Sequence, residues 1–129
     1  MSLRILAIAA AVFGVAAIGA APARAQQGPG PTLETLSELA DLLGRAHAIR
    51  SMCNGENDQT WRTYMFNMLA IEAPSGSPRK APLTSAFNRG FRTQQGRSDR
   101  CTPDMPRIEA ELAARGRALA ETVAASYLH

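Results

Sequence analysis

Five polar or amphipathic side chains stand out from the apolar pattern of this sequence. They are His47, Arg50, Trp61, Arg62 and Asn88. An arginine and a tryptophan at one opening suit a carboxylate, phosphate or sugar ligand, because a guanidinium pairs with anionic oxygens through several directed donors. The five residues therefore form a candidate ligand-binding site.

Three interpretations of this polar group remain open. In the first, the group is a structural network in which a carboxylate from Asp58, Glu72 or Asp99 neutralises Arg50, because an unpaired buried arginine is very costly. In the second, the group binds a small ligand. In the third, His47 is a general acid–base, which needs a partner that spacing does not identify. No Ser-centred elbow, H-E-x-x-H motif or phosphate loop is present, so we assign no catalytic residue.

The chain contains two cysteines, Cys53 and Cys101, separated by 48 positions. With only two histidines in the chain, they do not form a zinc site, and there is no C-x-x-C pair. In an exported protein an even pair predicts a disulfide. The internal methionines occur at helical spacing typical of core packing, so neither a metal nor a cofactor is predicted. These methionines are Met52, Met65, Met68 and Met105.

The N-terminus has the pattern of a cleaved signal peptide. Arg4 precedes an uncharged apolar run over residues 5–20, and the small residues Ala23 and Ala25 precede Gln26. Small residues at these two positions fit signal-peptidase cleavage after Ala25, so residues 1–25 are predicted to be a signal peptide. The run is shorter than the roughly 20 residues that cross a bilayer, and no membrane span is expected after cleavage.

Removal of residues 1–25 leaves 12 Lys and Arg against 11 Asp and Glu, a net charge of +1. Nucleic-acid binding depends on a basic surface that neutralises phosphates, so this balance argues against a nucleic-acid partner. A local run of basic residues over 79–100 is interpreted as a solvated helix face, with an anion or acidic-partner patch as the alternative.

The mature chain is predicted to be all-α, with a linker at 26–31 and a single domain at 32–129. Leu36, Leu39 and Leu43 recur at steps of three and four, which is helical rather than strand spacing. Gly90 on a third apolar stripe costs about 1 kcal/mol in a helix, which suggests close approach of another backbone. Four such segments predict a compact bundle tied by the disulfide. The first, second and fourth segments span 32–52, 59–73 and 103–127, and the third begins at 78 or at 82 and ends at 95.

Several short motifs together resemble a family of small exported alphaproteobacterial proteins of unknown function. The resemblance covers nearly all of the mature chain and implies a Gram-negative periplasmic location, but it implies no activity and no site residues. The sequence departs from the family pattern at Phe91, where the family favours tyrosine. The motifs are LGRxH at 43–47, WRxxM at 61–65, AFNxG at 86–90 and CT at 101–102.

Export, small size and the absence of catalytic motifs lead to one main functional hypothesis. The domain is expected to be a non-enzymatic periplasmic interaction module that acts on a cell-envelope protein or on peptidoglycan-associated machinery. The alternative is a small-ligand-binding domain for an anionic or sugar ligand near His47, Arg50 and Trp61. The sequence leaves the oligomeric state open.

Overall fold

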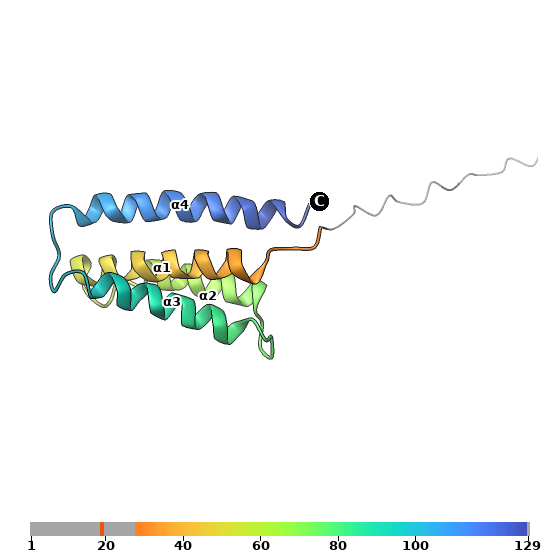
Figure 1. Ribbon diagram of the computed structural model, residues 1–129, viewed down its shortest axis with the longest axis horizontal. Helices are drawn as coiled ribbons and strands as arrows, with labels where there is room; N and C mark the ends of the chain where they lie inside the picture. The colour runs from red at the N-terminus through yellow and green to blue at the C-terminus, as the bar shows by residue number, and fades with distance from the viewer. Residues whose placement is uncertain (1–18, 20–27, 129) are drawn as a thin grey trace, which may run out of the picture.

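The computed structural model describes Gly19 and residues 28–128, and the chain from Leu33 to Ala125 forms four α-helices joined by short loops (Figure 1). No strand occurs among the described residues, which confirms the all-α prediction. Apart from Gly19, the expected signal peptide and its cleavage site lie outside the described residues. The helices are α1 (Leu33–Asn54), α2 (Thr60–Glu72), α3 (Lys80–Gln95) and α4 (Met105–Ala125).

Both ends of α1 follow from local sequence. The hydroxyl of Thr32 accepts a hydrogen bond from the backbone N–H of Thr35 at 3.1 Å, as an N-cap does. Gly55 follows the last helical residue with φ of +92°, a conformation that favours glycine, and its N–H binds the carbonyl of Ser51. The predicted first helix is confirmed and ends two residues later than expected.

The other three helices all pack on α1, which lies between α4 and α3 in Figure 1. One side of α1 carries Leu36, Ala40 and Leu43 into a cluster with α2 and α3. Another side carries Ala46 and Ile49 into a second cluster that includes the start of α4. Ten residues of α1 are buried, whereas α2 buries only Met65, so the core is built around one central helix.

Two glycines set the distance between α1 and α3. A Cβ on Gly44 would collide with the carbonyl oxygen of Phe87, and a Cβ on Gly90 would collide with the carbonyl oxygen of Asp41. The reciprocal pair lets the two backbones touch, and it confirms the close approach predicted at Gly90. Gly116 on α4 is different, because its nearest neighbour would be a methyl of Leu39 at an ordinary 3.7 Å.

The predicted disulfide is present between Cys53 and Cys101, whose Cα atoms lie 4.9 Å apart. It joins the last turn of α1 to the loop that precedes α4. Met105 packs beside it, with its sulfur 3.7 Å from that of Cys53. The bridge therefore brings the start of α4 to the end of α1.

The start of α4 differs from the sequence expectation. The fourth helix was expected to begin at residue 103, but it begins at Met105 after Asp104, and no side chain caps it. The hydroxyl of Thr102 instead donates to the Asp104 carboxylate at 2.5 Å, which lowers the pKa of that carboxyl. Pro106 then occupies the first turn, where its missing N–H costs nothing.

The last described residues hold the two ends of the domain together. The N–H groups of Gly28 and Gly30 donate to the carbonyls of Tyr127 and Ser126 at 2.8 and 3.1 Å. The Tyr127 hydroxyl donates to the Glu72 carboxylate at the end of α2, at 2.6 Å. Over the described residues, no helix is long and apolar enough to cross a membrane.

We predict that Gly44→Ala and Gly90→Ala each lower the free energy of unfolding by about 3 kcal/mol, because the added methyl meets rigid backbone. Gly116→Ala is the matched control and is expected to raise stability by up to about 1 kcal/mol through helix propensity. Urea unfolding followed by far-UV circular dichroism measures all three. Equal effects at the three glycines would contradict the close α1–α3 contact.

Candidate functional site

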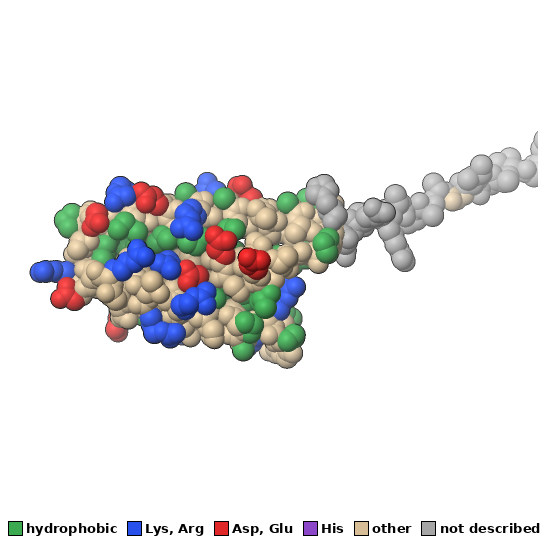
Figure 2. All heavy atoms as spheres, in the orientation of Figure 1, with side chains coloured by type: hydrophobic (Ala, Val, Ile, Leu, Met, Phe, Trp, Pro, Cys, Tyr) green, Lys and Arg blue, Asp and Glu red, His purple; other side chains and the backbone are tan. Residues whose placement is uncertain are grey.

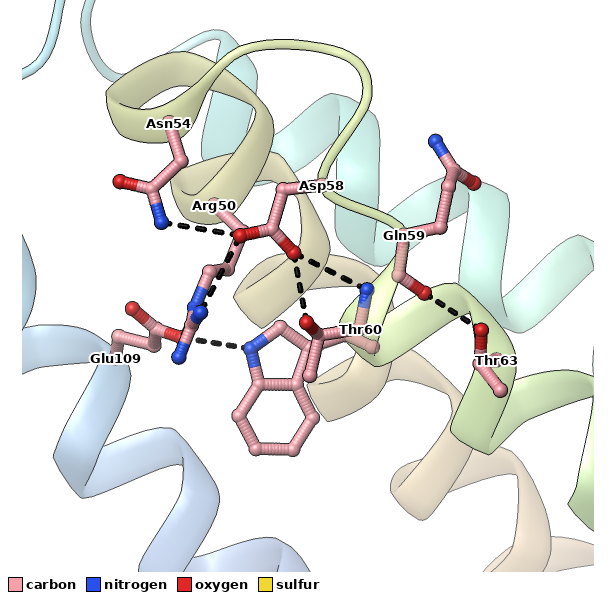
Figure 3. A network of polar contacts seen from close by, with 8 residues as sticks. Arg50, Asn54, Asp58, Gln59, Thr60, Thr63 and Glu109 are labelled. Carbon is pink, nitrogen blue, oxygen red and sulfur yellow. Dashed lines mark hydrogen bonds and ion pairs between the residues drawn. The ribbon is translucent and has the colours of Figure 1, made fainter.

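Glu109, near the start of α4, is the centre of the main polar cluster (Figure 3). Its Oε1 accepts from Arg50 Nε at 2.5 Å and from the indole N–H of Trp61 at 2.7 Å. Arg50 comes from α1 and Trp61 from the first turn of α2. One carboxylate oxygen therefore joins three helices at the end of the domain that also carries the disulfide.

Asp58, in the loop between α1 and α2, is the second acceptor for Arg50, at 3.3 Å from Nη1. It also accepts from the Asn54 amide at 3.0 Å and from the N–H and hydroxyl of Thr60. These hydrogen bonds, led by that of Asn54, hold the pKa of Asp58 well below its usual range. Asp58 thus fixes the loop and completes the pairing of Arg50.

Arg50 lies in this polar network, paired with two carboxylates. Hydrogen bonds to Glu109 and Asp58 raise the pKa of Arg50 above its ordinary value. Of the three carboxylates expected as partners, Asp58 is the one that pairs with Arg50. Glu72 binds Tyr127 instead, and Asp99 lies beside Arg100.

A cavity of about 610 Å³ opens between α2 and α3, and we call it the α2–α3 cavity. Three of the five expected site residues line it: His47, Arg62 and Asn88. Its remaining lining is mainly apolar, with a few polar groups from α3 and from the loop after α2. These residues are Met65, Phe66, Leu69, Ala70, Ala73, Pro74, Ser75, Lys80, Thr84, Phe87 and Phe91.

His47 forms part of the floor of this cavity and is only 7% exposed. Its ring lies 5.8 Å from that of Phe87 and 5.5 Å from that of Phe91. Its Nδ1 is buried with no hydrogen-bond partner. Burial lowers the pKa of His47, and the positive charge of Arg62 lowers it further, so the imidazole is uncharged at neutral pH.

A second hollow, of about 450 Å³, lies between α2 and α4, and we call it the α2–α4 groove. Leucines of α1 form its floor, and the two helices form its walls. Trp61 lines this groove and bonds Glu109 at one end, while Glu72 bonds Tyr127 at the other. Helix α2 thus has a hollow along each flank.

The five expected residues therefore divide among three places. His47, Arg62 and Asn88 meet in the α2–α3 cavity, Arg50 is in the Glu109 network, and Trp61 joins that network to the groove. Sequence reasoning missed Glu109. The predicted disulfide could have pointed to it. The disulfide brings the start of the fourth helix close to Arg50, so a glutamate in the first turns of that helix is a candidate partner.

The face formed by α4, α1 and α3 has a different character. Figure 2 shows acidic and basic side chains mixed over it rather than gathered by sign. Asp41 pairs with both Arg45 and Arg89, and Glu38 pairs with Arg115. Within the part of the chain that the structure describes, no group of three His, Cys, Asp or Glu side chains is placed to hold a metal.

Comparison with known proteins gives one match. A family model described as "Protein of unknown function (DUF2385)" matches residues 31–127. The chain belongs to the DUF2385 family. No curated protein and no solved structure shows significant similarity to it. The DUF2385 match spans all four helices, so the family corresponds to the folded domain, and the resemblance to a family of unknown function is confirmed.

We predict that Glu109→Ala lowers the free energy of unfolding by about 2 kcal/mol, because it leaves Arg50 and the Trp61 indole without this acceptor. The effect is smaller than for a fully buried pair, since a third of the Arg50 side chain is exposed. Glu109→Gln keeps an acceptor for the indole, so its free energy of unfolding is expected to lie between those of the wild type and Glu109→Ala. Chemical unfolding followed by Trp61 fluorescence measures the series.

Glu111→Ala is the control for this series, because it breaks the exposed Arg107–Glu111 pair on the same helix. We expect a change below about 0.5 kcal/mol. If Glu109→Ala were as mild as Glu111→Ala, Glu109 would not be a structural centre.

We predict that stability falls with acidification between pH 7.5 and pH 5 because of His47. Its pKa in the folded protein is lowered from the ordinary 6.5, so below that pH the unfolded chain binds more protons than the folded one. Urea unfolding at pH 7.5, 6 and 5 should show this decline in the wild type and a much weaker one in His47→Phe. His129→Gln, which changes the other histidine, should keep the wild-type slope, and the reverse result would refute the assignment.

Proposed function

We propose that this DUF2385 domain is a non-enzymatic interaction module of the cell envelope that binds a helix of a protein partner in the α2–α4 groove. The supporting observation is an apolar groove between two helices that both pack on α1 and whose backbones do not approach each other closely. The exposed side chains Tyr64 and Ile71 line its α2 wall and are 57% and 74% exposed. Large apolar side chains in contiguous exposed positions mark interaction surfaces.

The walls of the groove suit a helix as the occupant. On α2 the lining runs from Trp61 to Glu72, a length of about 16 Å or three turns. On α4 the lining includes the small residues Ala113, Gly116 and Ala120, which let another backbone come close. An amphipathic helix with apolar residues at every third or fourth position fits such a groove.

Charge adds one further feature to the partner. Arg117 is exposed, lines the α4 wall, and has no ion pair among the described residues. The groove's carboxylate, Glu72, is already bound by Tyr127. The partner helix is therefore expected to carry an acidic residue facing Arg117.

The proposed location in the envelope rests on two observations. The Cys53–Cys101 disulfide is formed, and disulfides persist mainly in oxidising compartments outside the cytoplasm. The N-terminal sequence has the order of charge, apolar run and small residues that export signals share. A location in the Gram-negative periplasm fits both observations.

Site-specific photo-crosslinking in cells tests the proposed docking. A benzoylphenylalanine at position 64 or 71 should form one adduct with an envelope protein, because both side chains line the groove. The crosslinked peptide should lie in an amphipathic helix. The same probe at Gln95, exposed at the end of α3 and outside both hollows, should give no adduct.

Two variants sharpen the test. Ala120→Arg fills the groove from an exposed position and should abolish the adduct, whereas Ala118→Arg on the outside of α4 should leave it intact. Absence of adducts at both groove positions, equal labelling from Gln95, or an adduct with a second copy of this chain would overturn the proposal.

A further inference from the structure

We infer that the α2–α3 cavity is a binding site for a small organic anion, with a carboxylate or phosphate head on an apolar body. This site is separate from the groove proposed for a protein partner. The two hollows lie on opposite flanks of α2 and share no lining residue.

The first argument is an unsatisfied buried polar atom on His47, a residue that lines the cavity. Nδ1 of His47 is the one side-chain nitrogen or oxygen in the described part of the chain that is buried without a hydrogen-bond partner. Such groups cost free energy and are rare in folded proteins, so an unpaired one calls for an explanation. Because this nitrogen is closed to solvent, a ligand reaches it only when the ring or its neighbours shift, and the ligand then supplies the partner that the protein itself lacks.

The second argument is the charge of the lining. Arg62 of α2 and Lys80 of α3 lie on opposite walls, and no carboxylate lines the cavity. Neither residue forms an ion pair with another described residue, and the guanidinium of Arg62 lies over the ring of Phe66, 5.3 Å from its centroid. Two cations that line one largely apolar hollow and have no carboxylate partner favour an anionic head group.

The third argument is size and polarity. A volume of about 610 Å³ is typical of small-molecule sites, which are mostly apolar with a few convergent polar groups. Phe66, Leu69 and Phe91 offer the apolar surface, and Asn88 adds an amide. A free inorganic anion would leave this apolar surface unused, so the ligand is expected to carry an alkyl chain or ring.

The test uses purified protein with its disulfide intact and four monomeric ten-carbon probes in calorimetric titrations. Decanoate and decyl phosphate carry the two anionic heads, decanol is neutral, and decyltrimethylammonium is cationic. At least one anionic probe should bind about tenfold or more tightly than decanol, because its head gains charge-assisted hydrogen bonds. The ratio of the affinities for decanoate and decyl phosphate identifies the preferred head group. Inorganic phosphate alone should bind more weakly than decyl phosphate.

Variants and spectroscopy locate the binding. Arg62→Gln and Lys80→Gln should each weaken anion binding about tenfold without changing the affinity for decanol. Arg92→Gln, an exposed change on α3 outside the cavity, should have no effect. The imidazole resonances of His47 should shift on titration with the anionic probe in the wild type, and Ala120→Arg in the groove should leave affinity unchanged.

Several results would overturn the inference. They are equal affinity for decanol and the anions, no binding of either anion, and anion binding that neither Arg62→Gln nor Lys80→Gln weakens. Binding only to vesicles of anionic phospholipid, and not to the monomeric probes, would also contradict it. Each outcome is independent of whether the groove captures a partner helix.

Discussion

One carboxylate oxygen of Glu109 accepts hydrogen bonds from both Arg50 and Trp61, and the position of α2 depends on this contact. Helix α2 buries only Met65 and makes few contacts with α3. Its N-terminal end is held by the Glu109 network and its C-terminal end by the bond from Tyr127 to Glu72. Apolar packing of Met65, Met68 and Leu69 holds α2 against α1, and the polar links fix its two ends while its flanks remain open.

The disulfide and the glycine contacts make this arrangement possible. Cys53 and Cys101 bring the start of α4 to the end of α1, where Glu109 can reach Arg50. Gly44 and Gly90 draw α3 so close to α1 that these two helices form a firm base. Helices α2 and α4 both pack on α1, their backbones do not approach each other closely, and the groove lies between them.

Much of the fold follows from the sequence, because its signals are local. The leucine spacing, the cap at Thr32 and the glycine after Asn54 each act within a few residues, and they define α1 correctly. The cysteine pairing was also accessible, since only one intramolecular pair is possible. The start of α4 was misplaced because Thr102 bonds a side chain rather than the helix backbone.

The candidate site was less accessible, because it depends on which helix faces which. His47 and Arg50 are three residues apart on α1, yet one faces α3 and the other faces α4 through Glu109. Periodicity places both residues on the inner side of α1 but does not show which of two neighbouring helices each one faces.

Hydrogen exchange of the indole N–H of Trp61, the only tryptophan in the chain, tests the role of Glu109 most directly. A strongly protected indole proton in the wild type is expected, and exchange as fast as that of free indole would contradict the role of Glu109 in positioning α2.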